Sequence, residues 1–192
     1  MVSVRALLIV FLCAGLVLFS SSCSLIHRVT EPAAHEKTVI DDTAKKAQAH
    51  ITLGQYEKAL ELYSSMYDKY HYPGMRSGYA RAGEQTRAAA DAAYQKRDFA
   101  DAGNIYTILF ESGITTRDFA RSLSFNDDYL SSQIGLCSKS LMEAGLTKYR
   151  EGKLEDAISV WKKALAFDQG NKDIKNAIDT ATTQLQNLKN IK

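Results

Sequence analysis

Gly152-Lys153-Leu154-Glu155-Asp156-Ala157 is the stretch that decides the fold, because its order of residue types occurs twice earlier in the chain. The earlier copies are Gly54-Gln55-Tyr56-Glu57-Lys58-Ala59 and Arg97-Asp98-Phe99-Ala100-Asp101-Ala102. Each copy has a turn residue, a Leu or aromatic residue two positions later, and Ala three positions after that. A large aromatic residue (Tyr63, Tyr106 or Trp161) follows seven positions after the first apolar one. This order predicts a corner between two helices, at which the Ala allows close approach and the aromatic residue fills the space beyond it.

The three corners resemble the second half of a tetratricopeptide repeat (TPR), a helix-pair unit that stacks into arrays. The third copy matches over residues 141–171, the first copy matches less fully, and the second diverges most because Arg97 replaces the turn glycine and Gly103 an apolar residue. The spacing also departs from the regular period of about 34 residues: 43 residues separate Gly54 from Arg97, and 55 separate Arg97 from Gly152. The matching residues of the third copy are Leu141, Gly145, Tyr149, Gly152, Leu154, Ala157, Ile158, Trp161, Ala164 and Leu165.

The resemblance implies an all-α fold, a right-handed TPR-like solenoid of about three helix pairs, over residues 43–192. We expect Ala59 and Ala157 to be buried at helix crossings. The stripe of apolar residues in 172–189 predicts a terminal capping helix with a polar outer face. An irregular insertion at about 114–128, with a short helix capped by Thr116, is expected either to carry binding specificity or to cover an exposed repeat edge.

The N-terminus predicts export. Residues 1–22 combine Arg5, an apolar run too short to span a bilayer comfortably, and small residues directly before Cys23. They resemble a bacterial lipoprotein signal peptide, in which the chain is cut before the cysteine and the thiol receives a diacylglycerol. An ordinary cleaved secretory signal and an uncleaved anchor are the two alternatives. Residues 23–42 are expected to form a polar tether, with Asp41, Asp42 or Thr43 capping the first helix.

Composition and motifs argue against several classes of function. The formal net charge of +2 is too small for a concentrated nucleic-acid-binding face. The four histidines lack the spacing of a metal site, and residues 126–128 suit helix capping better than a calcium loop. No nucleotide-binding or hydrolase motif is present, so we expect no cofactor and no enzymatic activity. Cys137 is expected to be a small buried hydrophobe rather than a reactive thiol.

The TPR resemblance also implies a binding surface, because first helices line the concave face of such arrays. The alternative aromatic strip, Tyr63, Tyr67 and Tyr70, suits the core better. The mixture of neutral, apolar and aromatic side chains on the implied face favours an extended peptide or a helix as the ligand. The implied residues are Gln48, Ile51, Thr52, Arg87, Asp91, Tyr94, Gln95, Met142, Leu146, Tyr149 and Arg150.

These features together predict a lipid-anchored TPR adaptor that faces the periplasm of a Gram-negative-type envelope. By resemblance, such proteins bind protein partners in the assembly of outer-membrane proteins, secretion systems, pili or peptidoglycan complexes. Ser24 after the cysteine favours the outer membrane in related lipoproteins. Two alternatives are a small-ligand or glycan-binding lipoprotein with a pocket beside the insertion, and an enzyme with an unfamiliar site.

The anchor is tested by the substitution Cys23→Ser. We expect a protein that partitions into detergent to become soluble or to remain uncleaved, because an N-terminus that carries several acyl chains binds membranes stably. Detergent-phase partitioning and the mass of the mature N-terminus measure this. A cleaved Cys23→Ser protein that still partitions into detergent contradicts the lipid anchor.

Overall fold

The computed structural model describes residues 33–190. The expected signal peptide, Cys23 and the first part of the expected tether lie outside these residues. The chain divides between Thr43 and Ala44 into two compact units, and helical residues at 33–52 span the division.

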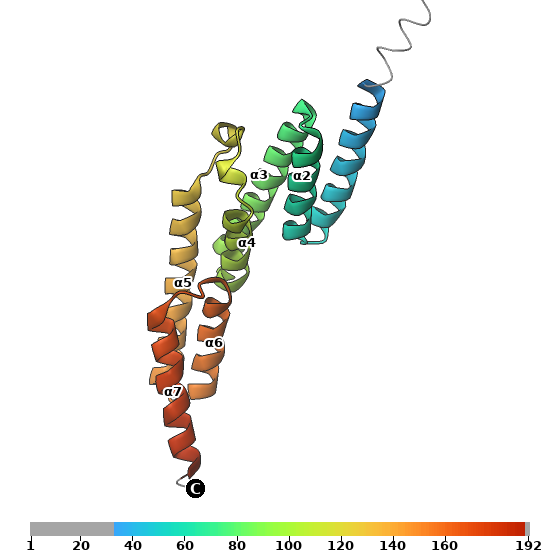
Figure 1. Cartoon of the computed structure of the whole chain (residues 1–192). Helices are drawn as coiled ribbons and strands as arrows, with labels where there is room; N and C mark the ends of the chain where they lie inside the picture. The colour runs from blue at the N-terminus through green and yellow to red at the C-terminus, as the bar shows by residue number, and fades with distance from the viewer. Residues whose placement is uncertain (1–32, 191–192) are drawn as a thin grey trace, which may run out of the picture. The chain divides into compact units, whose positions relative to one another are not determined.

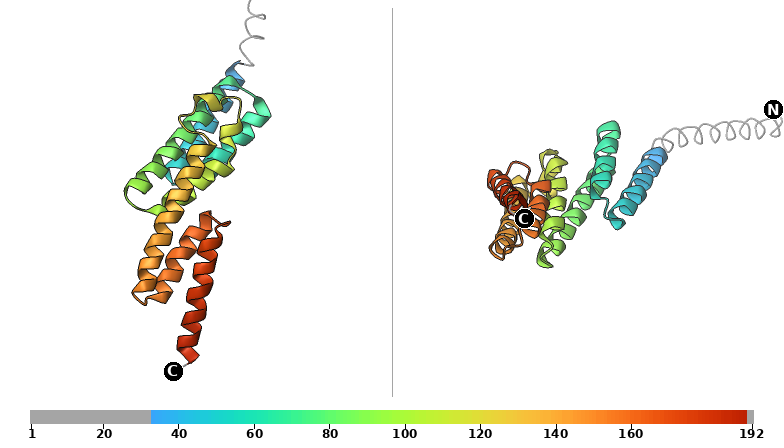
Figure 2. Two further views of the ribbon diagram at one scale, coloured as in Figure 1. Left: turned by 90° about the vertical axis from the view of Figure 1, so that its left-hand side faces the viewer. Right: turned by 90° about the horizontal axis from the view of Figure 1, so that it is seen from below.

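Within residues 33–190 all regular structure is helical, which confirms the all-α class. Neighbouring helices pack in chain order from α2 to α7, and α4 also contacts α6 (Figures 1 and 2). The right-handed TPR-like solenoid stays a prediction. After residue 52 the elements are α2 (Tyr56–Tyr70), α3 (Pro73–Gln95), α4 (Phe99–Glu111), the 3-10 turns η1 (Ile114–Thr116) and η2 (Ala120–Ser122), α5 (Asp127–Arg150), α6 (Leu154–Phe167) and α7 (Lys172–Asn190).

The three quoted corners have the same backbone geometry. Gly54, Arg97 and Gly152 adopt left-handed conformations with φ of 70°, 62° and 74°. The N–H group of the next residue donates to the carbonyl five positions earlier, at 2.9, 3.0 and 3.0 Å respectively. These bonds satisfy carbonyl groups that the helix end leaves unpaired. Each corner therefore ends one helix and starts the next in the same way.

The small and aromatic residues of each copy pack as expected. Ala59, Ala102 and Ala157 are fully buried, which confirms the prediction for Ala59 and Ala157. Tyr106 and Trp161 are each 1% exposed, and Tyr63 and Tyr67 are buried, so these two tyrosines belong to the core rather than to a surface strip. Burying an aromatic side chain stabilises a fold by about 1.5–3 kcal/mol. The repeated residues are therefore main contributors to the core.

The glycine at position 103, where the pattern predicts an apolar residue, is explained by contact with Phe167, which is distant in sequence. Gly103 is buried, and the ring of Phe167 at the end of α6 lies where the Cβ of a larger residue would be, 2.5 Å from that position. A glycine therefore allows α4 to receive Phe167 directly. The same arrangement occurs at Gly145 on α5, where a Cβ would lie 2.1 Å from the indole nitrogen of Trp161.

The N-terminal boundary of the helical part differs from the expectation. Residues 33–42 are helical, so the helix begins well before the expected cap at residues 41–43. Thr43 lies inside this helix, where its hydroxyl donates to the carbonyl of Val39 at 2.7 Å. A threonine that bonds to the preceding turn tolerates an interior position. Residues 33–42, which the sequence assigns to the tether, are therefore helical.

The insertion also differs from the expectation in detail. It contains the turns η1 and η2 instead of one short helix, and the hydroxyl of Thr116 donates to the carbonyl of Gly113 instead of capping a helix. Helix α5 begins at Asp127. Its cap is Asn126, whose side-chain oxygen accepts from the N–H of Tyr129 at 2.9 Å. This confirms a capping role for the polar segment at 126–128.

Cys137 is fully buried on α5. Burial disfavours the thiolate and raises the pKa of the thiol to about 11. The prediction of a small buried hydrophobe is confirmed.

The corner geometry is tested by Arg97→Gly. The left-handed conformation costs an L-residue about 1–2 kcal/mol, and glycine loses roughly 0.5–1 kcal/mol more backbone entropy on folding. We therefore expect the free energy of unfolding, measured by chemical denaturation, to rise by about 0.5–1 kcal/mol.

Gly152→Ala is the matched control at the equivalent position of the third corner. A Cβ there meets no atom within 4 Å, so the substitution reports backbone strain without a steric clash. It is expected to lower stability by about 1 kcal/mol. A loss of stability in both variants would contradict a shared left-handed corner.

Candidate functional site

The residues implied by the resemblance lie on the first helix of each pair. Gln48 lies beside α3, because its side-chain oxygen accepts a hydrogen bond from Gln85 at 3.3 Å. Ile51 lines a small cavity of about 50 Å³ together with Gln48, Gly78 and Gln85. The structure therefore brings Gln48 and Ile51 next to α3.

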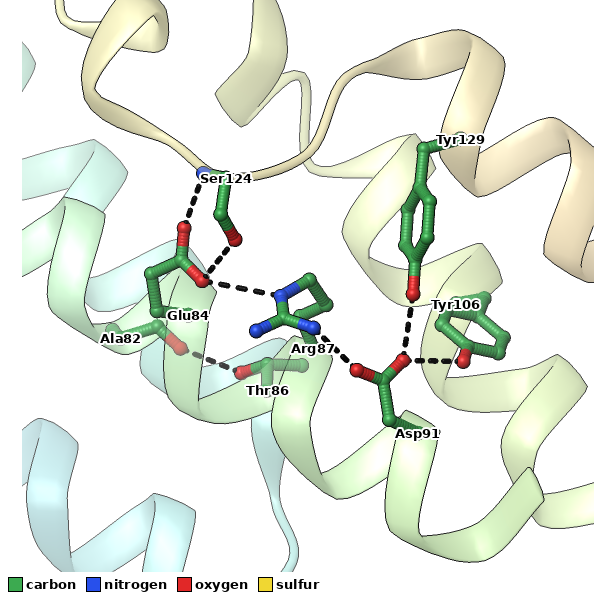
Figure 3. Close-up of polar contacts among 8 residues, drawn as sticks. All are labelled: Ala82, Glu84, Thr86, Arg87, Asp91, Tyr106, Ser124 and Tyr129. Carbon is green, nitrogen blue, oxygen red and sulfur yellow. Dashed lines mark hydrogen bonds and ion pairs between the residues drawn. The ribbon is translucent and has the colours of Figure 1, made fainter. Parts of the chain in front are cut away.

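Arg87 and Asp91 on α3 belong to a polar network that joins three helices (Figure 3). The guanidinium of Arg87 pairs with Asp91 and donates from Nε to Glu84 at 3.1 Å. Oδ1 of Asp91 also accepts hydrogen bonds from the hydroxyl groups of Tyr106 on α4 and Tyr129 on α5, at 2.6 and 2.8 Å. One carboxylate thus connects α3, α4 and α5.

The pKa values of both tyrosines and of Arg87 are raised in this network. Burial, followed by the hydrogen bond to Asp91, raises the pKa of Tyr106 and of Tyr129. Partial burial acts to lower the pKa of Arg87, but its bond to Glu84 and the charge of Asp91 raise it overall. Both phenols therefore remain donors and Arg87 remains charged at neutral pH, which suits a structural network better than proton transfer.

The insertion is attached to α3 through Glu84 in the same network. This carboxylate accepts from the backbone N–H of Ser124 at 2.6 Å and from its hydroxyl at 2.7 Å (Figure 3). Partial burial acts to raise the pKa of Glu84, but the bonds from Ser124 and Arg87 lower it overall. Glu84 was not among the residues implied by the sequence, because its partner lies 40 positions away.

The other end of the insertion is attached to α2 and to the start of α3. Arg117 pairs with Asp68 at 2.6 Å and donates to the hydroxyl of Ser64 at 2.6 Å. Asp118 accepts from the hydroxyl of Tyr67 at 2.8 Å and pairs with Arg76 at 2.8 Å. Ile114 and Phe125 of the insertion itself are buried, so the insertion packs against these helices. Of the two roles expected for the insertion, this favours packing over binding.

The implied aromatic residues are half-buried. The ring of Tyr94 contacts Phe99 edge-on, with ring centroids 5.4 Å apart, and that of Tyr149 contacts Trp161, with centroids 6.0 Å apart. Gln95 and Arg150 beside them are exposed. Within the described residues no hydrogen bond, ion pair or ring contact joins Tyr94 or Gln95 to Tyr149 or Arg150.

The remaining implied residues complete the face without forming a cluster. Thr52 is exposed, and its hydroxyl donates to the carbonyl of Gln48 at 2.9 Å. Met142 and Leu146 on α5 are half-buried, and the carbonyl of Met142 accepts from the indole N–H of Trp161 at 3.1 Å. These side chains offer an apolar floor on α5 and polar groups on the first helix.

Sequence reasoning missed part of the α3 surface. Arg81, Gln85, Ala88, Ala92 and Gln95 follow one another at intervals of three and four residues, and all are exposed or half-exposed. This spacing places them on one helix face. The intervals of three and four residues can be counted in the sequence itself, so this signal could have found the stripe. Among the residues implied by the resemblance, only Gln95 belongs to it.

In the part of the chain that the structure describes, no group of three His, Cys, Asp or Glu side chains is arranged to hold a metal ion. His50 is half-buried and bonds through Nδ1 to the side-chain oxygen of Gln55 at 2.8 Å, so it supports the first corner. No helix among residues 33–190 has the length and apolar character needed to span a membrane. The sequence matches no protein-family model and no curated protein.

The attachment of the insertion is tested by Glu84→Gln. The neutral amide cannot form the ion pair with Arg87. It also places an NH₂ group where a carboxylate oxygen accepts hydrogen bonds from Ser124. Because hydrogen bonds to a charged group contribute about 1.5–3 kcal/mol, we expect the free energy of unfolding at pH 7 to fall by roughly 1–2 kcal/mol.

The pH dependence has a defined sign. The folded state lowers the pKa of Glu84, so the stability it contributes is present above the ordinary pKa of a glutamate, about 4.3, and is lost as pH falls through the lowered value. The difference between wild type and Glu84→Gln should therefore shrink in acid. Glu143→Gln, at an exposed glutamate without an ion pair among the described residues, is the matched control and should change little. A constant difference at pH 7 and pH 3 would contradict the assigned role.

Proposed function

We propose that this chain is a lipid-anchored adaptor on the periplasmic side of the outer membrane, whose helical array binds a protein partner in envelope assembly. The partner is a chain of a secretion, pilus or outer-membrane-protein machine. It binds as an extended peptide or a helix along the face made by residues 44–52, α3 and α5.

The observation that carries this proposal is the repeated corner. Three corners with one backbone geometry connect successive antiparallel helices, and neighbouring helices pack in chain order. Helix pairs that repeat in this way stack into TPR-like solenoids, whose first helices share one continuous face. Such faces bind peptides and helices through shape and hydrogen bonds.

The chemistry of this face supports a protein ligand. The charges of Arg87 and Asp91 are compensated within the network, so the exposed implied residues are mainly neutral: Gln48, Thr52 and Gln95, together with Arg150. Half-buried Tyr94 and Tyr149 present one edge beside them. A face with aromatic groups and few uncompensated charges suits polypeptide better than phosphate-rich ligands.

The membrane attachment in this proposal comes from the N-terminal sequence. In this proposal, acylated Cys23 holds the chain at the membrane. Ser24 after the cysteine supports the outer membrane as its location.

The alternative, a small-ligand or glycan-binding envelope lipoprotein, is favoured by one observation. A cavity of about 380 Å³ lies between α2 and α4, with Tyr79 of α3 in its wall. Its lining contains no residue of 114–128, although Arg117 of the insertion bonds to Ser64 and Asp68 in its wall.

The proposed face is tested with a photo-crosslinking amino acid placed singly at Gln95 and Arg150 in the native cell. Both positions are expected to crosslink to the same partner, because they lie on first helices of successive pairs. Lys162 and Lys163, which are exposed on the second helix α6, are the matched control positions and should not crosslink to it.

Tyr94→Ala combined with Tyr149→Ala should then weaken capture of that partner by about tenfold or more, if each residue contributes roughly 1–2 kcal/mol. Circular dichroism must show unchanged helicity, because both tyrosines also pack on their own helix pair. Equal crosslinking from first and second helices, or normal capture by a folded double variant, would refute the proposed face.

A further inference from the structure

The cavity between α2 and α4 has an acidic rim without counter-ions. Glu57 and Glu61 lie one turn apart on α2, and Glu111 contributes from the end of α4. None of these three carboxylates forms an ion pair among the described residues. Like charges one turn apart on a helix repel each other. The folded chain therefore maintains a concentration of negative charge around a concavity.

A fourth carboxylate, also exposed, lines the same cavity but is compensated. Asp68 is paired with Arg117, which approaches it with both terminal nitrogens at 2.6 and 3.2 Å. Arg117 of the insertion contacts this wall through Ser64 and Asp68, and its charge is offset by Asp68. The uncompensated charge of the cavity thus comes from the three glutamates.

A buried hydroxyl group in the wall lacks a hydrogen bond of standard geometry. Tyr79 is fully buried, and its hydroxyl makes no such bond within the described chain. The hydroxyl lies close to Ser64 and Asp68, which also line the cavity: burial raises the pKa of Tyr79, although weak hydrogen bonding with Ser64 and Arg117 acts to lower it, and Asp68 raises it. Buried polar groups in folded proteins nearly always have a partner. A ligand in the cavity would supply one.

The rest of the lining combines apolar side chains with Ser65 and Ser112. Leu60 of α2 is buried, Ile108 of α4 is half-buried, and the ring of Tyr79 lies beside them. A volume of about 380 Å³ is at the lower end of small-ligand pockets. The cavity therefore combines apolar side chains for a short aliphatic stem with a negative rim.

We propose that this cavity binds an aliphatic cation, a primary ammonium or guanidinium group on a short alkyl stem. The stem packs on Leu60, Ile108 and the ring of Tyr79, and the cation pairs with Glu61 and Glu111. An anionic ligand would meet the uncompensated carboxylates and is disfavoured. The same chemistry is presented by a free diamine and by a lysine side chain of another polypeptide.

This inference goes beyond the proposed adaptor and does not depend on it. The cavity is lined by the second helices α2 and α4 and by Tyr79 of α3, whereas the proposed partner face uses other residues of α3, together with residues 44–52 and α5. Loss of amine binding would leave partner crosslinking at Gln95 and Arg150 unchanged, so failures of the two proposals are distinguishable.

The test is isothermal titration of the purified full-length protein with 1,5-diaminopentane, with Nα-acetyl-lysine methylamide and with neutral 1,5-pentanediol. We expect saturable binding of at least one cation, no binding of the diol, and weaker binding in high salt because screening reduces the attraction. Binding of the diamine alone assigns the cavity to free amines, and binding of the lysine derivative alone assigns it to a polypeptide side chain.

Variants locate the binding. Glu61→Gln combined with Glu111→Gln should weaken binding by about tenfold or more, whereas the charge-matched control Glu143→Gln with Glu155→Gln should bind as wild type does. Tyr79→Phe removes only the hydroxyl and should weaken binding without a loss of thermal stability. No saturable binding of either cation below about 10 mM, equal binding of the diol, or full affinity in the Glu61/Glu111 variant overturns the proposal.

Discussion

The fold depends on one backbone constraint, the left-handed residue that turns each helix back beside the next. At Gly54, Arg97 and Gly152 the same hydrogen bond closes the helix end, so each pair of helices leaves its corner in the same direction. The fully buried alanine that follows each corner permits close packing, and the aromatic residue two turns later fills the remaining space. Short-range geometry thus sets the long-range order of the helices.

The divergent middle of the chain is held by interactions that the regular corners do not need. Asp91 receives hydrogen bonds from α4 and α5 and pairs with Arg87, while Glu84 attaches the insertion to α3. Buried polar networks of this kind are costly when incomplete and specific when satisfied. Together with the ring of Phe167 packed directly on Gly103, this network connects the helices in the part of the chain where the repeated sequence pattern diverges most.

The network also separates two surfaces by their electrostatics. On the first helices the charges of Arg87 and Asp91 cancel, which leaves a largely neutral face with aromatic edges. Between the second helices α2 and α4, Glu57, Glu61 and Glu111 line a cavity and form no ion pair with any residue that the structure describes. A neutral face favours shape-directed binding of a polypeptide, whereas an uncompensated acidic rim favours cations. The two proposed binding activities follow from this difference in charge compensation.

The sequence alone determined the all-α class, the three corners, the burial of Ala59, Ala157 and Cys137, and the cap at Asn126, because each depends on residues within a few positions of one another. Only the tertiary structure decided what Arg87, Asp91 and Glu84 do, since their partners lie on other helices or in the insertion. The early start of the first helix and the acidic cavity were also beyond the sequence. The helix starts early although the polar composition of residues 33–42 suggests a tether. The cavity forms only because residues 57–68 and 108–112 lie side by side. The periodicity of the sequence shows on which face of its own helix a residue lies. Ion pairs and cavities depend on which faces of different helices meet, and this is decided only in the tertiary structure.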